Sequence, residues 1–276
     1  MTDGGAPRPD LGTGPIEDYT REGIAENLGT RIIGRYIRWH EVLPSTSDLA
    51  MSLAEIQVPE GTIVVAEEQT AGRGRLGRPW ASPRGGVWLS VILRPGLPPP
   101  RAPLVGLAAA VAAARAIRTT TGLLARVKWP NDVLVDGRKV VGILLDAGPG
   151  AEWVVVGVGI NANVPRSALP ADAQSPAASL QDLLGGPVDR GVLVRALLRE
   201  LERGYEELRA GGAASALRRW REMADTLGRI VRVETPAGAI EGMALDVDDA
   251  GALLVRRRDG EVHRVIAGDV KVRAVG

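Results

Sequence analysis

The sequence predicts an α/β (α+β) fold followed by a small β-rich domain. Two observations carry this prediction. Over most of the 276 residues, apolar strand-like runs such as Val87–Leu93 alternate with segments of helical periodicity such as Arg190–Arg209. After Gly228 the pattern changes to short alternating strands separated by turns. A chain of this length has room for one sizeable core and a small second domain.

The first hundred residues predict a tail, two helices and three strands. Residues 1–20 are rich in Gly, Pro and Asp, which predicts a flexible tail. Helices are predicted at Arg21–Leu28 and Thr46–Ile56, the second with Ser45 or Thr46 as its N-cap. Strands are predicted at Arg35–Val42, Thr62–Ala66 and Val87–Leu93. Between the last two strands lies a glycine-rich loop, Glu67–Gly86.

The middle of the chain predicts a long helix, a hairpin and a run of further helices. Prolines 98–100 end the preceding segment before an alanine-rich helix, Pro103–Thr119. A turn at Asp136-Gly137 joins two strands into a hairpin. Strands are predicted at Arg126–Lys128, Val133–Val135, Val140–Asp146 and Trp153–Asn161. Helices are predicted at Ala177–Leu184, Arg190–Arg209 and Ala213–Met223.

The C-terminal segment predicts a small β-barrel, too small to be very stable unless it docks on the larger domain. Strands are predicted at Arg229–Glu234, Ile240–Val247, Ala252–Arg257 and Val262–Ile266. Turns are predicted at Pro236-Ala-Gly238, Asp248-Asp-Ala-Gly251 and Asp259-Gly260. We therefore divide the chain into a flexible segment (1–34), a large domain (35–227) and the small domain (228–276).

Composition excludes several classes of function. The formal net charge is +1, so the whole molecule exerts no strong pull on nucleic acid or on a membrane. The absence of cysteine excludes disulfides, thiol nucleophiles and cysteine metal sites, and two histidines far apart disfavour a histidine metal centre. The N-terminus has no secretory signal pattern, and the apolar stretch Leu104–Ala114 is too short to span a bilayer. We expect a cytoplasmic protein.

The loop Gly72-Arg-Gly-Arg-Leu-Gly-Arg78 predicts an anion site. It matches G-x-G-x-x-G, but Pro79 and Trp80 follow where the dinucleotide fingerprint requires a helix, so a Rossmann site is disfavoured. Glycines let the backbone approach a ligand, and arginines match phosphate or carboxylate oxygens. Because three arginines repel one another, we expect the loop to be mobile until an anion binds. The alternative is a solvated arginine turn.

A second polar segment follows at Lys128-Trp-Pro-Asn-Asp132, with Lys139 opening the next apolar strand. Trp-Pro-Asn-Asp is a turn signal between strands, so its polar groups face a pocket or solvent. The alternative is that Trp129 packs in the core while Asn131 and Asp132 only form the turn. Only three of the 34 basic residues are lysines, and two of these three, Lys128 and Lys139, lie in this region. Their retention indicates a need for a compact ammonium.

Taken together, these segments resemble the biotin protein ligase family in motif, order and spacing. The resemblance rests on 68–80, 128–132, 138–144 and the strand end Gly157-Val-Gly-Ile-Asn161, and it covers about residues 35–276. It implies a mixed-sheet ligase domain followed by an SH3-like barrel. It also implies an enzyme, a biotin–[acetyl-CoA-carboxylase] ligase, that joins biotin and Mg-ATP into biotinyl-5′-adenylate. The biotin then passes to a lysine of a biotin carboxyl carrier protein.

The resemblance also implies the site residues. The catalytic candidates are Lys139 and Arg75. The implied biotin-binding residues are Ser45, Thr46, Ser47, Gln69, Arg73, Gly74, Arg75 and Lys139. The implied ATP-binding residues are Arg78, Trp80, Lys128, Asn131, Asp132 and Asn161. No protein metal site is implied, because Mg²⁺ arrives with ATP; Asp132 either reaches that ion through water or caps the turn. Family members usually have Asn where this chain has Ser47.

Three other functions remain as alternatives. A lipoate or octanoate ligase shares the fold, although the Gly-Arg-Gly-Arg loop favours biotin. A biotin-responsive repressor would need an N-terminal DNA-binding domain, and only about 34 residues precede the ligase domain. A non-catalytic binding module would not need Lys139 and the arginine loop. The expected partners are biotin, ATP and the carrier, with no specific DNA and no membrane, and a homodimer is left open.

Overall fold

A computed structural model describes residues 19–170, 176–235 and 238–272. In it, a seven-stranded mixed sheet, in the order β1-β2-β3-β7-β6-β5-β4, forms the centre of the large domain. Only β1 and β2 are parallel, and all other neighbours are antiparallel. The strands are β1 (Ile37–Leu43), β2 (Ile63–Gln69), β3 (Val87–Leu93), β4 (Arg126–Lys128), β5 (Asp132–Val135), β6 (Arg138–Ala147) and β7 (Val154–Ile160).

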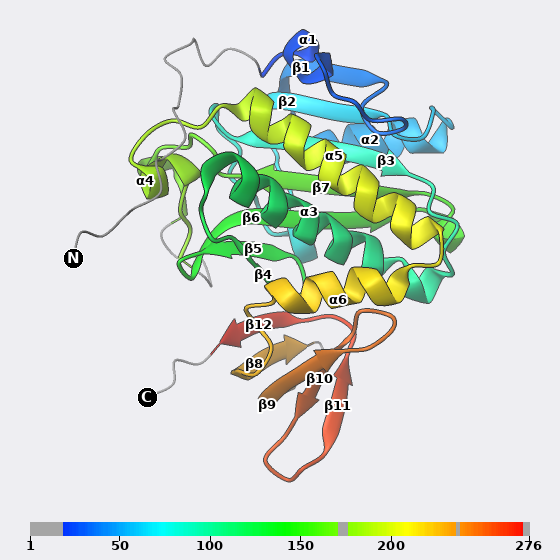
Figure 1. Cartoon of the computed structure of the whole chain (residues 1–276), viewed down its shortest axis with the longest axis vertical. Helices are drawn as coiled ribbons and strands as arrows, with labels where there is room; N and C mark the ends of the chain where they lie inside the picture. Colours follow the sequence, from blue (N-terminus) through cyan, green and yellow to red (C-terminus); the bar gives the residue numbers. More distant parts are fainter. Residues whose placement is uncertain (1–18, 171–175, 236–237, 273–276) are drawn as a thin grey trace, which may run out of the picture.

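Helices cover both faces of this sheet, and α1, α3, α5 and α6 gather on one face (Figure 1). Here α3 packs against α5, α6 and β6, and α1 packs against α5 and β1. On the other face α2 packs on β2, β3 and β7. The helices are α1 (Arg21–Ala25), α2 (Thr46–Glu55), α3 (Pro103–Thr121), α4 (Leu180–Leu184), α5 (Arg190–Arg209) and α6 (Ala213–Met223).

The two faces of β3 explain this layering. Leu89, Val91 and Leu93 belong to the main core with α3 and α5, whereas Ile92 belongs to a smaller apolar cluster under α2. A strand buried on both faces reads as a continuous apolar run. That run is why the sequence predicts β3 with the bounds that the structure shows.

Helix α3 lies in the centre of the molecule. By length and composition alone, the segment Pro99–Thr121 would be long enough to cross a membrane, although 72% of its most apolar window is buried inside the protein. Its small alanines let α5 approach closely, with Gly204 of α5 near Ala108. The helix is longer than the apolar stretch considered from the sequence, and its apolarity reflects burial between the sheet and two helices.

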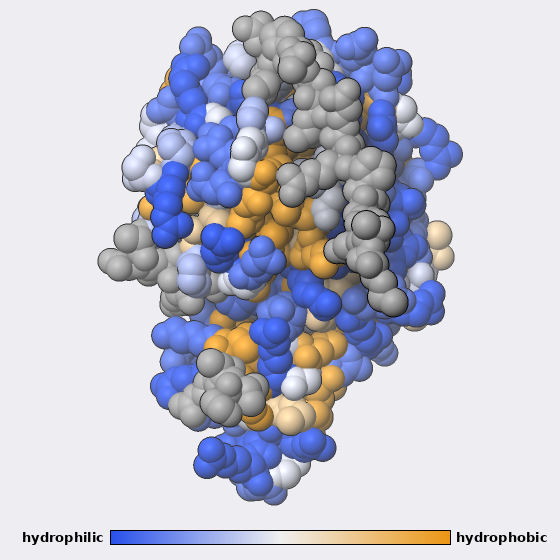
Figure 2. Space-filling view, turned by 60° about the vertical axis from the view of Figure 1, so that its left-hand side comes forward, coloured by the Kyte–Doolittle hydropathy of each residue, from blue (hydrophilic) through white to orange (hydrophobic). Residues whose placement is uncertain are grey.

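The small domain is a five-stranded antiparallel sheet in the order β11-β10-β9-β8-β12. Figure 1 shows it below the large domain, next to α6, and Figure 2 shows apolar residues between hydrophilic ones on both domains. Strand β12 was not expected from the sequence, and the expected turn at Pro236-Ala-Gly238 falls partly outside the described residues. The strands are β8 (Ile230–Thr235), β9 (Gly238–Val247), β10 (Leu253–Arg256), β11 (Val262–Val265) and β12 (Asp269–Val272).

The expectation of a flexible segment up to residue 34 is wrong for residues 19–34, because Tyr19, Ile24 and Ile33 are buried. The carboxylate of Glu202 on α5 accepts three consecutive backbone N–H groups, those of residues 31–33, at 2.6–2.8 Å. A carboxylate that accepts several backbone N–H groups makes strong charge-assisted hydrogen bonds. These residues therefore pack as part of the large domain.

Candidate active site

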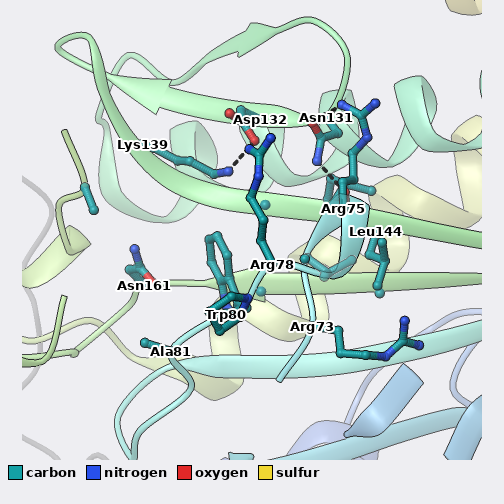
Figure 3. A pocket seen from close by; sticks show the side chains of 18 of the residues that line it. Arg73, Arg75, Arg78, Trp80, Ala81, Asn131, Asp132, Lys139, Leu144 and Asn161 are labelled. Carbon is teal, nitrogen blue, oxygen red and sulfur yellow. Dashed lines mark hydrogen bonds and ion pairs between the residues drawn. The ribbon is translucent and has the colours of Figure 1, made fainter. Parts of the chain in front are cut away.

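One cavity of about 490 Å³ opens where α2, the arginine loop, β5–β7 and the small domain meet. A pocket of this size suits a small molecule. Every site residue named from the sequence lines it, and Figure 3 shows some of them around the opening. They are Ser45, Thr46, Ser47, Gln69, Arg73, Gly74, Arg75, Arg78, Trp80, Lys128, Asn131, Asp132, Lys139 and Asn161.

Hydroxyl and amide groups line one end of the cavity, at the start of α2. Ser45 is the N-cap of α2, and its side chain accepts a backbone N–H of the first turn. Gln69 Oε1 accepts from Thr46 N at 2.8 Å and from Thr46 Oγ1 at 3.0 Å. Ser90 Oγ lies 2.9 Å from Thr46 Oγ1 and 3.1 Å from Ser47 Oγ. Sequence reasoning missed Ser90, although a serine inside an otherwise apolar buried strand was a signal for it.

The floor of the cavity is apolar because two strand glycines let Trp80 lie against the sheet. A Cβ at Gly142 would lie 2.9 Å from the indole ring, and one at Gly159 would lie 2.6 Å from its Nε1. A Cβ at Gly157 would meet the Ser47 hydroxyl oxygen at 2.7 Å. Any larger residue would displace Trp80 or the start of α2, so these glycines preserve the pocket's shape.

Lys139 reaches over this floor from β6. Its Nζ lies 2.6 Å from Asp132 Oδ1 and 5.0 Å from the centre of the Trp80 ring. Figure 3 shows the end of the Lys139 side chain directed at Asp132, with a dashed line marking the ion pair. Because β6 runs between β5 and β7, Lys139 does not occupy a solvated edge strand. Its ammonium is held by a carboxylate and an aromatic face, which leaves a positive charge directed at the cavity.

The first loop arginine turns away from the centre of the cavity. Arg73 Nε donates to Asp48 Oδ1 at 2.9 Å, and Arg73 Nη2 lies 3.6 Å from Asp146 Oδ2. In Figure 3 its side chain extends away from Lys139 and Trp80. Burial raises the pKa of Asp146, and the nearby Arg73 guanidinium partly opposes that rise.

The other two arginines meet the small domain. Arg75 Nη1 donates to the carbonyl of Gly268 at 3.1 Å, and Arg78 pairs with the carboxylate of Asp269. Burial lowers the pKa of Arg75. The carboxylates of Asp48, Asp146 and Asp269 neutralise part of the loop's charge, which reduces the mutual repulsion expected from the sequence; the mobility of the loop stays a prediction. Sequence reasoning also missed Asp269, because its four-residue strand lies far along the chain.

The Lys128–Asp132 turn serves both the core and the cavity. Trp129 is 1% exposed, and its Nε1 donates to the carbonyl of Gly251 in the small domain at 3.0 Å. Asn131 Nδ2 donates to the carbonyl of Ile143 at 2.7 Å, which fixes the turn beside β6. Burial lowers the pKa of Lys128, and the charge of Asp132 partly offsets this. The two interpretations of this segment are therefore both partly right: Trp129 is core, and Asn131 and Asp132 face the cavity.

Asn161, at the end of β7, closes the cavity on the side of α4. It is buried, and its Nδ2 donates to the carbonyl of Ala178 at 3.2 Å. Among residues 19–170, 176–235 and 238–272, no group of three or more His, Cys, Asp or Glu side chains could hold a metal ion. The described cavity thus offers cations for anionic ligands and two carboxylates beside them, Asp132 next to Lys139 and Asp269 next to Arg78.

Comparisons with known proteins agree with this architecture. Residues 39–163 match the Biotin/lipoate A/B protein ligase family, and residues 226–273 match the Biotin protein ligase C terminal domain. The chain is 36% identical to Bifunctional ligase/repressor BirA of Bacillus subtilis, over 90% of this chain and 78% of that protein. It is also 36% identical to the Biotin--[acetyl-CoA-carboxylase] ligase of Mycobacterium tuberculosis, over 88% of this chain and 93% of that protein.

Among solved structures, the biotin protein ligase of Aquifex aeolicus in complex with biotin and ATP superposes with a TM-score of 0.76. It is 26% identical in sequence, and the match covers 87% of this chain and all of that one. Both of its domains are therefore found in this chain. The chain belongs to the biotin/lipoate A/B protein ligase family and carries the C-terminal domain of the biotin protein ligases.

Proposed function

We propose that this chain is an ATP-dependent biotin protein ligase. In the first reaction the biotin carboxylate attacks the α-phosphorus of ATP, forming biotinyl-5′-adenylate and releasing pyrophosphate. In the second, a lysine amine of a biotin carboxyl carrier protein attacks the acyl carbon. An amide forms, AMP leaves with the bonding electrons, and the amine loses a proton. The observation that carries the proposal is Lys139, held by Asp132 over Trp80 in the cavity that the arginine loop borders.

Lys139 supplies the charge that this chemistry requires. Two anions, a carboxylate and a triphosphate, must approach to about 3 Å before the bond forms. The ammonium of Lys139 lies near Asp132, so it can neutralise the carboxylate and the α-phosphate without crossing the pocket. Charge stabilisation of this kind is typically the largest single contribution to catalysis. Arg75, which is largely buried beside Asn131, supplies the second cation.

Biotin binding is assigned to the end of the cavity near α2. The hydroxyl and amide groups of Thr46, Ser47 and Gln69 match the donors and acceptors of a cyclic urea. Strand residues of the lining such as Ile143 and Val158 supply the apolar wall that the rest of the biotin molecule needs. Ser45, Arg73 and Gly74 complete this end of the cavity.

ATP binding is assigned to the side of the cavity that meets the small domain. Arg78, Lys128 and Asn131 line that side, and two of them carry positive charge. Trp80, and Asn161 on the side of α4, complete the assignment. Mg²⁺ would arrive with ATP, which brings its own phosphate oxygens as ligands. Two carboxylates line the cavity, Asp132 and Asp269, and each is paired with a cation, Lys139 or Arg78; this sparse donor set fits an ion held mainly by phosphate and water.

The carrier is proposed to be that of an acetyl-CoA carboxylase, because the relative from M. tuberculosis bears that name. We place the reaction in the cytoplasm, and the proposal includes no specific DNA target and no membrane partner. A second copy of the chain is a further partner that the proposal allows.

The decisive experiment incubates the protein with a carrier domain, ATP and one of three acids: biotin, lipoate or octanoate. Mass spectrometry should find one modified lysine with biotin only. Lys139→Ala is the matched control and should leave the carrier unmodified. Equal modification by lipoate or octanoate would instead assign the chain to the other activity of the fold, and no modification with any acid would reject the ligase proposal.

A further inference from the structure

The arginine loop lies within a longer excursion of the chain, residues 67–86, between the last paired residues of β2 and β3, Ala66 and Trp88. The first three residues of the excursion are the end of β2, which still lies beside β1. Gln69, Arg75, Arg78 and Trp80 all lie on this excursion, so their positions in the cavity depend on how its two ends are held. The two ends of the excursion lie outside the cavity lining. They are joined by three side chains, those of Tyr19, Glu67 and Arg190, which we name the base cluster.

Tyr19 contacts both ends of the excursion. It is 2% exposed, and its hydroxyl oxygen accepts the backbone N–H of Trp88 at 3.0 Å. The same hydroxyl lies 3.4 Å from the carbonyl of Ala66 and 3.3 Å from the carbonyl of Trp88, to either of which it can donate. Ala66 precedes the excursion and Trp88 follows it. One phenol therefore bridges β2 and β3 where the excursion begins and ends.

Arg190 and Glu67 make a second bridge beside the first. The Arg190 guanidinium lies 4.4 Å from the centre of the Tyr19 ring, and its Nη1 donates to both Glu67 oxygens at 2.9 Å. The same nitrogen lies 3.1 Å from the carbonyl of Gly86, and Glu67 accepts the N–H of Gly85 at 3.2 Å. Glu67 thus belongs to the outgoing end, while Gly85 and Gly86 belong to the returning end.

The base cluster is mostly buried, which makes its hydrogen bonds costly to remove. The side chains of Arg190 and Glu67 are each 13% exposed. Burial raises the pKa of Tyr19 far above the physiological range, so its hydroxyl keeps its proton. If one of these side chains is removed, a buried donor or acceptor is left without a partner. The free-energy cost of such an unsatisfied group exceeds the net stabilisation that a solvent-exposed hydrogen bond provides.

We propose that Tyr19, Glu67 and Arg190 are positioning residues that hold the base of the excursion closed, so that Arg75 and Arg78 stay over the biotinyl-adenylate until the carrier lysine arrives. The inference rests on the proposed function, since it needs an adenylate to retain. None of the three residues lines the cavity, so their effect passes through the loop.

A similar cluster at the other end of β3 provides a matched control. The buried Tyr205 hydroxyl accepts the backbone N–H of Arg94 at 3.1 Å and donates to Glu60, and the Arg209 guanidinium lies 5.6 Å from its ring. It has the same chemistry of phenol, carboxylate and guanidinium. It anchors Arg94, which follows β3, and none of its residues touches the excursion. A tyrosine-to-phenylalanine substitution at position 19 or position 205 removes one buried hydroxyl group.

The experiment compares Tyr19→Phe with Tyr205→Phe in the full-length protein. The first measurement is the free energy of unfolding, which both changes should lower to a similar extent. The second measurement is the rate at which preformed biotinyl-adenylate leaves the protein in the absence of carrier, monitored by rapid filtration. Tyr19→Phe should speed this release about tenfold, the size expected from one unsatisfied buried group. Tyr205→Phe should leave the release rate at the wild-type value.

Two further variants keep the test decisive if Tyr19→Phe yields too little folded protein. Glu67→Gln retains an acceptor for the N–H of Gly85 but loses the ion pair with Arg190. Arg190→Lys retains the positive charge that Arg190→Met removes, so Arg190→Lys should release adenylate more slowly than Arg190→Met. Wild-type adenylate retention in folded Tyr19→Phe and Glu67→Gln would overturn the inference, and so would equal release from Tyr205→Phe. If the wild-type protein forms no adenylate from biotin and ATP, it is the proposed function that fails.

Discussion

The ammonium of Lys139 lies 2.6 Å from Oδ1 of Asp132, seven residues earlier in the chain, with the β5–β6 hairpin between them. The hairpin turn at Asp136-Gly137 brings the two side chains to the same side of the cavity. The carboxylate of Asp132 therefore orients the lysine at the cavity. Preorganised charge of this kind needs little rearrangement when negative charge develops.

Removing the ammonium should suppress the first reaction. We predict that Lys139→Ala lowers the rate of adenylate formation by about 10²–10³, the effect typical of losing a preorganised charge. Lys139→Arg should also be impaired, because a planar guanidinium cannot take the place of a compact ammonium between Asp132 and Trp80. Pyrophosphate release measures the rate. Near wild-type release from Lys139→Ala would rule out this role.

The arginines of the loop should differ in their effect on the intermediate. Arg75 is largely buried at the cavity, whereas Arg73 is paired with Asp48 and Asp146. We predict that Arg75→Ala folds normally but releases biotinyl-adenylate, which then labels nearby lysines without specificity. Gly74→Val should act in the same direction, and Arg73→Ala should have the smaller effect. Labelling of a bystander protein measures escape, and strict carrier specificity in Arg75→Ala would contradict the prediction.

ATP affinity should fall at alkaline pH because of Lys128. Burial lowers the pKa of Lys128 below its ordinary value of 10.5, so the free protein loses this charge at a lower pH than an exposed lysine does. A bound triphosphate favours the charged form and raises that pKa again. Binding above the lowered pKa must therefore take up a proton, and affinity declines as pH rises through it. Titration calorimetry in two buffers measures the uptake, and Lys128→Arg should abolish it.

Stability should depend on the indole nitrogen of Trp129. Its hydrogen bond to the carbonyl of Gly251 joins the two domains in a buried place. We predict that Trp129→Phe lowers the free energy of unfolding by about 1–3 kcal/mol, because the carbonyl loses its partner. Denaturant unfolding followed by circular dichroism measures the loss. An unchanged midpoint would show that the small domain docks without this bond.

The small domain should serve both half-reactions through different residues. Gly268 and Asp269 contact Arg75 and Arg78, so deleting 228–276 should impair adenylate formation and transfer while biotin still binds. The exposed Arg256 and Arg258 lie away from the cavity lining. Arg256→Glu/Arg258→Glu should slow only carrier biotinylation, with a weaker salt dependence, because charges at an encounter surface mainly change the association rate. Full-rate biotinylation by the truncated protein would contradict this role.

Much of the fold follows from local patterns. The apolar run at Val87–Leu93, the helical periodicity of Arg190–Arg209 and the Asp-Gly turn each predicted an element that the structure contains. Elements at the margins were less predictable. The helix expected from Ala177 begins at Leu180, after the cap Ser179. The backbone on either side of Ala177 is bonded elsewhere: the N–H of Ala178 donates to the carbonyl of Lys139 in β6, and the carbonyl of Ala178 accepts from the side-chain amide of Asn161.

The sequence by itself determined which residue types gather at the site, because the glycine-spaced arginines, the Trp-Pro-Asn-Asp turn and Lys139 are local motifs. Only the tertiary structure decided their partners. Arg78 pairs with Asp269 some 190 positions later, and Tyr19 bridges Ala66 and Trp88. Periodicity shows which face of an element is buried, but it does not show which distant elements become neighbours. Those pairings depend on how the sheet, its helices and the small domain pack together, because burial of apolar surface is non-directional whereas ion pairs and hydrogen bonds need atoms within about 3 Å.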